Sequence, residues 1–143
     1  MGKINEKMYT TSAVSVGGRN GHVKSADGFI DMDLRTPGAM GGPGGATTPE
    51  DLFASGYAAC FNGALNLAAS LSKIKVGETK VTVEVSLGKD ADGNLQLGAK
   101  IEAIVPGVDQ ATAQQLVDKA HTICPYSRAT KGNIDAELVA KAE

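Results

Sequence analysis

The chain has 143 residues, which is the size of one compact domain, and we expect a single domain across residues 1–143. Its 16 acidic residues slightly outnumber its 14 basic ones, so the surface has no excess positive field to hold a polyanion or an anionic membrane. The charge balance therefore argues against nucleic acid and membranes as partners.

The N-terminal sequence MGKINEKMYTTSAVSV is too polar for the apolar core of a signal peptide. No stretch approaches the roughly 18 apolar residues of a membrane span. We therefore expect a cytoplasmic protein. In a reducing compartment, two cysteines are more often catalytic, metal-binding or inert than a permanent disulfide.

The first third of the chain is typical of short strands. From Met8 to Leu34, apolar residues alternate between turns rich in Gly, Asn and Asp, which predicts a small antiparallel meander. The following residues 36–47, TPGAMGGPGGAT, are so rich in Gly and Pro that they predict a loop.

A long helix is expected next. Thr48 is a capping residue, Pro49 suits the first helical position, and the acids that follow face the positive end of the helix dipole. The helix can run to about Ser72, with Ala and Gly on several of its faces. A short chain has difficulty burying such a helix alone, so we expect it to pack against a second subunit.

The remaining elements complete an α+β domain. Residues 76–87 and 95–105 alternate as two strands of a hairpin, and residues 109–122 have apolar positions at helical spacing. Pro125 is expected to stop that helix, and alternation from Ile134 predicts a last short strand.

The two cysteines allow two interpretations. Cys60 lies in the middle of the small-residue helix, and Cys124 lies just past the second helix. Both can be inert, buried small side chains. Alternatively, one thiolate attacks a peroxide oxygen to give a sulfenic acid, and the second thiol condenses with that acid before further oxidation destroys it.

A reactive Cys60 needs a cation or a hydrogen-bond donor, because an apolar helix raises the pKa of a thiol. Arg19, in a turn rich in Gly, can supply the cation and can also bind a peroxide oxygen, and Glu50 can orient it. Ten residues separate Glu50 from Cys60, about 15 Å along a continuous helix. If both serve one site, either the helix breaks or Glu50 comes from a neighbouring subunit.

Other chemistries have little support. His22 and His121 lack the spacing of a zinc site with the cysteines, so we expect structural roles for both and no metal. The glycine-rich loop lacks the Gly-Lys-Ser/Thr of a phosphate loop, and no dinucleotide fingerprint follows a strand, so no cofactor is expected. Aromatic residues near the cysteines can line an apolar substrate pocket: Phe53, Tyr57, Phe61 and Tyr126.

The chain resembles the organic hydroperoxide resistance proteins, within the wider group that includes osmotically inducible peroxidases. Four segments, spread over nearly the whole chain, carry the resemblance in their order and in the 64-residue spacing of the cysteines. They are GGRNGH (17–22), TPEDLF (48–53), GYAACF (56–61) and CPYSRATKGNI (124–134).

The resemblance implies an intertwined homodimer in which antiparallel sheets wrap around long central helices, with active sites at the subunit interface. It also implies residue roles. Cys60 matches the peroxide-attacking cysteine, Cys124 the resolving cysteine, and Arg19 and Glu50 the pair that activates the thiolate and places the peroxide. The implied substrates are alkyl and fatty-acid hydroperoxides, and the implied reductant is a dithiol, the dihydrolipoyl group of a lipoylated protein.

Two other functions stay open at this point. The chain can be a redox sensor whose cysteines form a switch without turnover, although no DNA-reading element or output domain is evident. It can also be a small-molecule carrier that uses the same apolar dimer cavity and has structural cysteines. Steady-state turnover separates the peroxidase from the sensor, and the pKa of the Cys60 thiol separates it from the carrier.

Overall fold

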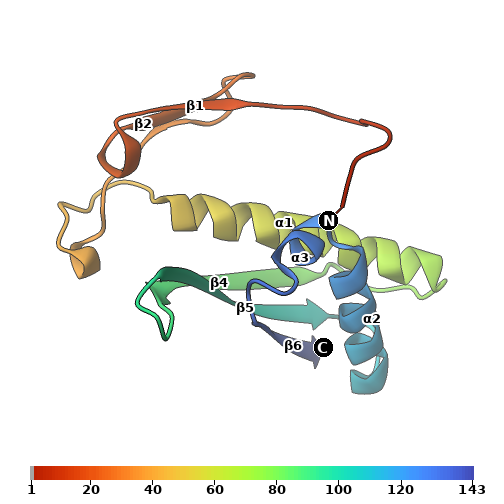
Figure 1. Cartoon of the computed structure of the whole chain (residues 1–143). Coiled ribbons are helices and arrows are strands. Elements are labelled where there is room, and N and C mark those ends of the chain that lie inside the picture. The colour runs from red at the N-terminus through yellow and green to blue at the C-terminus, as the bar shows by residue number, and fades with distance from the viewer. Residues whose placement is uncertain (1) are drawn as a thin grey trace. The chain divides into compact units, whose positions relative to one another are not determined.

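The structure is a computed structural model that describes residues 2–143 (Figure 1). It divides into two compact units, Met1–Pro49 and Glu50–Glu143. The division concerns compactness alone, and the single folding domain expected from chain length stays a prediction.

The N-terminal unit contains the expected meander. Its strands β1 (Ala13–Val16), β2 (His22–Ser25) and β3 (Asp31–Asp33) form an antiparallel sheet in the order β1-β2-β3. A single 3-10 turn, η1 (Gly18–Asn20), connects β1 to β2. The Gly/Pro-rich segment that follows is irregular apart from a second short 3-10 turn, η2 (Gly38–Met40).

The long helix α1 (Pro49–Leu71) begins and ends where the sequence predicted. Pro49 occupies its first position, where a missing N–H costs nothing, and acidic residues follow in the first turn. One face is buried in the C-terminal unit. The buried residues of this face are Tyr57, Phe61, Ala64, Leu65, Ala68 and Ala69.

A second sheet, in the order β4-β5-β6, forms the base of the C-terminal unit. The hairpin of β4 (Lys80–Lys89) and β5 (Leu95–Val105) is antiparallel, with Gly93 at a φ of 83° in its turn. The first strand starts at Lys80 rather than at residue 76. The last strand, β6 (Ala136–Ala142), runs parallel to β5, because two helices carry the chain back between them.

Those helices are α2 (Gln110–Ile123) and α3 (Pro125–Thr130). Helix α2 was expected, and its cap is Asp109, whose carboxylate accepts from the backbone N–H of Thr112 at 2.8 Å. Helix α3 was not expected. Pro125 does end α2, but it also takes the first position of a new helix, which its fixed φ favours.

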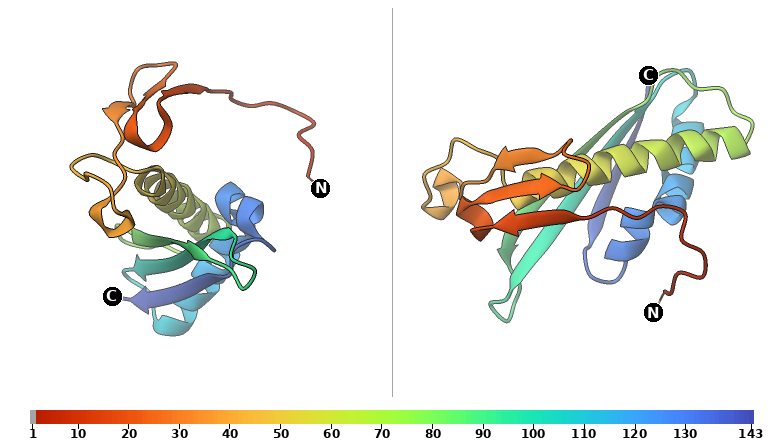
Figure 2. Two further views of the ribbon diagram at one scale, coloured as in Figure 1. Left: turned by 60° about the vertical axis from the view of Figure 1, so that its left-hand side comes forward. Right: turned by 90° about the horizontal axis from the view of Figure 1, so that it is seen from above.

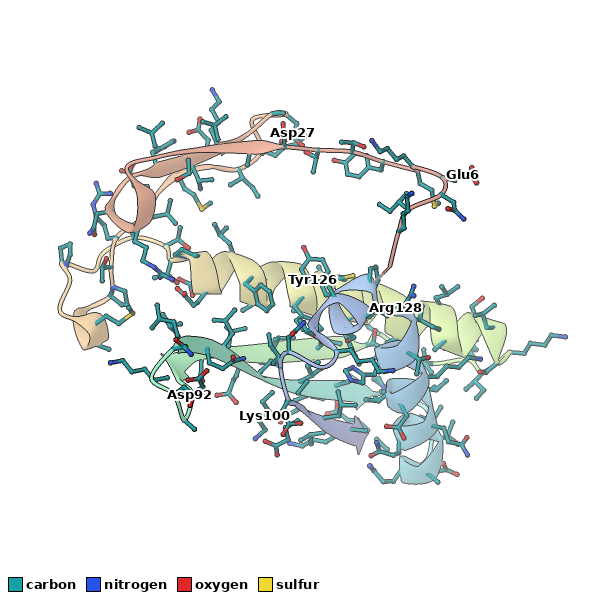
Figure 3. The ribbon with its side chains drawn as sticks, viewed as in Figure 1. Glu6, Asp27, Asp92, Lys100, Tyr126 and Arg128 are labelled. Carbon is teal, nitrogen blue, oxygen red and sulfur yellow. The ribbon has the colours of Figure 1, made fainter. Side chains whose placement is uncertain are left out.

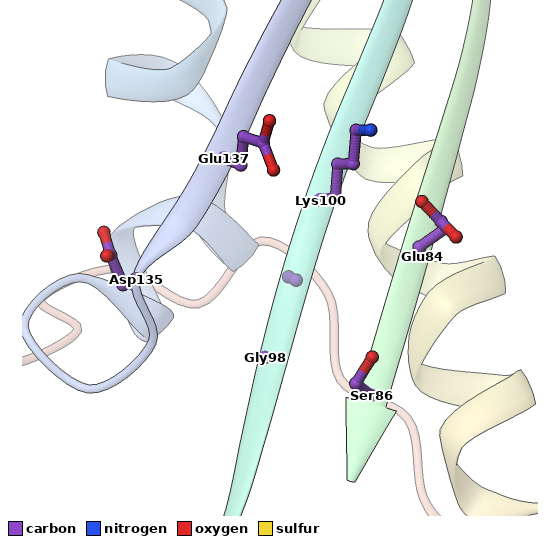
Figure 4. A pocket seen from close by; sticks show the side chains of 7 residues that line it. Glu84, Ser86, Gly98, Lys100, Asp135 and Glu137 are labelled. Carbon is purple, nitrogen blue, oxygen red and sulfur yellow. The ribbon is translucent and has the colours of Figure 1, made fainter. Parts of the chain in front are cut away.

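The core of the C-terminal unit lies between the helices and one face of the sheet. Helix α1 crosses the strands (Figure 2), and Val83, Ile101 and Val105 are buried there. The other face is polar and carries Glu84, Lys100 and Glu137, which line an open cavity of about 630 Å³ (Figure 4). This alternation of apolar and polar faces confirms the α+β class.

Candidate active site

The two cysteines lie side by side although 64 residues separate them in the chain. Both are free thiols, and the Cys124 sulfur donates a weak hydrogen bond to the Cys60 sulfur across 3.6 Å. Cys60 is half-buried on α1, whereas Cys124 is completely buried. Of the two cysteines, Cys60 alone is exposed to solvent and can meet a dissolved molecule.

The junction between α2 and α3 fixes the place of Cys124. This residue ends α2, where its backbone N–H donates to the carbonyl of Ala120, and it is also the residue before the first turn of α3. The backbone N–H of Arg128 donates back to the carbonyl of Cys124. Cys124 is therefore held from both sides by helical hydrogen bonds, with its side chain toward α1.

Opposing effects act on the Cys60 thiol. Removal from water is the largest, and it raises the pKa of Cys60 above that of an ordinary thiol. The backbone N–H of Tyr126 donates to the sulfur and lowers the pKa, while the neighbouring Cys124 raises it by smaller amounts. The expected penalty of an apolar helix is thus present. The donor that lowers the pKa is a backbone N–H on α3, and the identities of the side chains do not predict it.

A close contact between α1 and α3 brings this donor to Cys60. A Cβ atom at Gly56 would lie 2.8 Å from the hydroxyl oxygen of Tyr126, which is too close for two such atoms. Glycine at this position therefore lets the Tyr126 ring lie against α1, one turn before Cys60. Figure 3 labels Tyr126, whose side chain projects from α3 beside α1.

Three of the four expected pocket residues form one aromatic cluster beside Cys60. The rings of Phe53 and Tyr57 meet edge to face at 5.9 Å, and Tyr126 lies 6.3 Å and 5.7 Å from them. Phe61 points elsewhere, toward His121 at 6.4 Å. Tyr57 and Phe61 are fully buried, so Phe53 and the more exposed Tyr126 are the members placed to contact a ligand.

Two buried hydroxyl groups and the half-buried ring of His121 form a hydrogen-bonded chain near the cysteines. The Tyr57 hydroxyl is 2.8 Å from Ser127 Oγ, and Ser127 Oγ is 2.9 Å from Nδ1 of His121. The chain joins α1, α3 and α2 in that order. The structural role expected of His121 stays a prediction, and Ser127 was not singled out from the sequence.

Arg19 belongs to the N-terminal unit, in η1. The turn is tightly built, because a Cβ at Gly21 would lie only 1.8 Å from the carbonyl oxygen of Val16. The Arg35 guanidinium also donates to the carbonyls of Asn20 and Gly21, both at 3.1 Å. The backbone that carries Arg19 is thus held within its own unit.

Glu50 lies in the first turn of α1, and Cys60 lies further along the same unbroken helix. The first of the two options for a shared site, a break in the helix after its first turn, is therefore wrong. Glu50 and Cys60 of one chain stay about 15 Å apart along the axis. A site that uses both needs Glu50 from a second chain, and this stays a prediction.

Other kinds of site find no support in residues 2–143. No group of three or more His, Cys, Asp or Glu side chains in this range is placed to hold a metal ion. None of the helices described is long and apolar enough to cross a membrane. The cavity on the polar sheet face is lined by neither cysteine.

The sequence is similar to those of known proteins over most of its length. Residues 42–139 match the family model of OsmC-like proteins. The chain is 47% identical, over 92% of its length and 93% of the relative, to an organic hydroperoxide resistance protein of Xanthomonas axonopodis pv. citri. It is 45% identical to the organic hydroperoxide resistance protein OhrA of Bacillus subtilis, covering 94% of this chain and 97% of the relative.

Solved structures give the same result. A crystal structure of an organic hydroperoxide resistance protein from Legionella pneumophila has a TM-score of 0.91 and 46% identity, covering 95% of this chain and 99% of the other. That of the protein OhrB of Bacillus subtilis has a TM-score of 0.85 and 40% identity, covering 96% and 100%.

Proposed function

Because the chain belongs to the OsmC-like family, and within it to the organic hydroperoxide resistance proteins, we propose that it is a cysteine-based peroxidase that reduces organic hydroperoxides to alcohols. The observation that carries this proposal is the pair of free thiols 3.6 Å apart, one accessible and one buried. This asymmetry matches a reaction in which one sulfur meets the substrate and the other acts afterwards.

Cys60 carries out the first step. Its thiolate attacks the terminal peroxide oxygen, so that an S–O bond forms as the O–O bond breaks. The substrate leaves as an alkoxide, which takes up a proton to become the alcohol, and Cys60 becomes a sulfenic acid. The half-buried position of Cys60 supports this assignment, because the completely buried Cys124 offers no approach to a dissolved peroxide.

Cys124 carries out the second step. Its thiolate attacks the sulfur of the sulfenic acid, an S–S bond forms, and the hydroxide that leaves takes up a proton to become water. Disulfide formation needs the sulfurs to close to about 2.05 Å, a small movement from van der Waals contact. A dithiol then restores both thiols by exchange, and a dihydrolipoyl group on a lipoylated protein is the reductant that we propose.

The thiolate needs more stabilisation than the C-terminal unit supplies, because burial raises the pKa of Cys60 despite the Tyr126 amide. Arg19 is the group that we assign to lower it, by its positive charge and by hydrogen bonding to the peroxide. Glu50 orients Arg19. Since α1 is continuous, we propose that the Glu50 of each site comes from the second subunit of a homodimer.

Exposed apolar surface in both units supports a dimer. In the C-terminal unit, α1 leaves Ala59, Gly63 and Leu67 exposed at four-residue spacing on the face opposite its buried side. In the N-terminal unit, Tyr9 and Phe29 are 79% and 91% exposed beside a cavity of about 480 Å³. Apolar surface of this kind is typical of a face that another chain covers.

The substrate preference follows from the surroundings of Cys60. The rings of Phe53 and Tyr126 give an apolar tail a surface to bury, whereas hydrogen peroxide gains nothing from them. We therefore propose alkyl and fatty-acid hydroperoxides as the substrate class.

The test is steady-state consumption of an alkyl hydroperoxide, and separately of hydrogen peroxide, with dihydrolipoamide as reductant. We expect repeated turnover with the alkyl hydroperoxide, a lower kcat/KM with hydrogen peroxide, and no turnover in Cys60→Ser. Without the dithiol, Cys124→Ser should consume one equivalent and accumulate sulfenic or sulfinic acid at Cys60. Turnover that persists in Cys60→Ser, or a single reaction per thiol pair in the unaltered protein, rejects the peroxidase.

A further inference from the structure

We propose that Ser127 is a positioning residue for the resolving step: by joining Tyr57 of α1 to His121 of α2, it holds Cys124 within reach of Cys60. The biological role of this positioning rests on the proposed function. The distance between the two sulfurs can be tested without it. All five residues belong to the C-terminal unit.

Each residue of the hydroxyl chain lies one helical turn from a cysteine. Tyr57 precedes Cys60 by three residues on α1, and His121 precedes Cys124 by three residues on α2. Ser127 follows Cys124 by three residues and lies on α3. Tyr57 and Cys60 share a face of α1, and Cys124 is the capping residue between the last turn of α2, which carries His121, and the first turn of α3, which carries Ser127.

Burial shields the bond between the Tyr57 and Ser127 hydroxyls from water. Tyr57 is 0% exposed and Ser127 is 1% exposed, so water does not compete freely for their hydroxyls. One consistent arrangement has the Tyr57 hydroxyl donate to Ser127 Oγ, while Ser127 donates to Nδ1 of His121. The other neighbour of the Tyr57 hydroxyl, Thr130 Oγ1, is at 3.4 Å and is a poor substitute.

Near the thiols, two weaker side-chain contacts also link these helices: the Tyr57–Thr130 contact at 3.4 Å and the bond between the two sulfurs at 3.6 Å. Asn62 and Asn66 of α1 bond to each other and to Thr79, just before β4, and Lys119 donates to Ser72, just past the C-terminal end of α1. Loss of the Ser127 hydroxyl therefore leaves the position of α3 near Cys124 to apolar packing, to these two weaker contacts and to the backbone bonds at Cys124.

The Tyr57–Ser127–His121 chain acts on the resolving step, because the rate of that step depends on the distance between two protein atoms. The Cys124 sulfur must approach the Cys60 sulfenic acid in line with the S–O bond that breaks, while the peroxide reaches Cys60 by diffusion. A misplacement of about 1 Å in such a reaction can cost on the order of a hundredfold in rate. Ser127→Ala should therefore slow disulfide formation more than it slows peroxide attack.

The decisive measurement is the effective concentration of the thiol pair, obtained by equilibrating the protein with reduced and oxidised dithiothreitol. We expect Ser127→Ala to lower it by roughly tenfold or more, and Ser127→Thr, which keeps the hydroxyl, to restore much of the loss. With one equivalent of alkyl hydroperoxide, Ser127→Ala should also leave more Cys60 trapped as sulfenic acid and overoxidised. Mass spectrometry measures both forms.

Ser72→Ala is the control, because the exposed Ser72 hydroxyl also bonds to a residue of α2, Lys119, but lies away from the thiols, just past the C-terminal end of α1. It should leave the effective concentration unchanged. If Ser127→Ala does not fold, Tyr57→Phe removes the same bond from the other side and replaces it in every measurement.

An effective concentration within twofold of the unaltered protein, in Ser127→Ala or its substitute, overturns the proposal even if the melting temperature falls. Because dithiothreitol exchange involves no peroxide, this outcome is distinct from failure of the peroxidase. Absence of turnover in the unaltered protein rejects the proposed function and leaves the positioning result standing.

Discussion

The hydroxyl oxygen of Tyr126 lies so close to Gly56 that a Cβ atom on residue 56 would be only 2.8 Å from it. The Tyr126 ring, which projects from the first turn of α3, therefore lies directly against α1. The same turn carries the backbone N–H that donates to the Cys60 sulfur. Gly56 thus leaves room for the ring of the residue whose backbone N–H contacts the thiol one turn away.

We expect Gly56→Ala to raise the pKa of Cys60 further, because the added methyl group displaces Tyr126 and with it the amide donor. The pH dependence of alkylation by iodoacetamide measures this change. The double variant Gly56→Ala/Tyr126→Ala is the control, since it removes the clashing ring and keeps the amide. An unchanged pKa in Gly56→Ala contradicts the proposed role of the contact.

Arg19→Gln should also raise the pKa of Cys60, for a different reason. If Arg19 supplies the positive charge of the site, its loss removes stabilisation from the thiolate. At a pH below the pKa, peroxide attack slows about tenfold for each unit by which the pKa rises, and the difference narrows as the pH increases. Stopped-flow kinetics across the pH range measure it.

Lys24→Gln is the matched control for Arg19→Gln, because Lys24 is an exposed cation on β2 of the same unit. It should have the pH profile of the unaltered protein. Equal losses in the two variants would indicate a general effect of charge and would remove Arg19 from the site.

Leu67→Arg tests the dimer. Leu67 is 47% exposed on the outer face of α1, and a guanidinium there is costly to bury against a second copy. We expect a shift from dimer to monomer in sedimentation, together with loss of peroxidase turnover. Leu95→Arg, at a 70% exposed position on the hairpin, should change neither. A functional monomer would exclude a site that takes Glu50 from the partner.

His22 should titrate above the usual range of a histidine. Its Nδ1 lies 2.8 Å from Asp33 and its Nε2 2.5 Å from Asp31, and only the protonated ring donates to both carboxylates. The hydrogen bonds to Asp33 and then Asp31 raise the pKa of His22 in the folded state. The stability from these contacts is therefore fully present below about pH 6.5 and is lost as the pH rises through the folded pKa.

Proton NMR of the His22 ring measures this midpoint, and thermal melts over the same pH range follow the stability. Asp33→Asn should bring the midpoint down, because it removes the largest cause of the shift. A His22 midpoint at or below that of a free histidine would contradict the assignment.

Local patterns in the chain were sufficient for most elements of the fold. Proline at position 49 and the small residues after it predicted α1, and alternation predicted the meander and the hairpin. Helix α3 was missed because six residues carry too little periodicity to be seen, and Pro125 was taken only as a stop. The parallel pairing of β6 was missed because pairing direction depends on the path between strands.

For the site, the sequence alone determined which residue types are present and in what order: two cysteines, an arginine in a glycine-rich turn, and an acid at a helix start. Only the tertiary structure decided that the two sulfurs lie 3.6 Å apart and that the group donating to the Cys60 sulfur is the backbone amide of Tyr126. It also revealed the Tyr57–Ser127–His121 chain. These are contacts between helices far apart in the chain, and no local pattern of side chains specifies the distance at which helices pack.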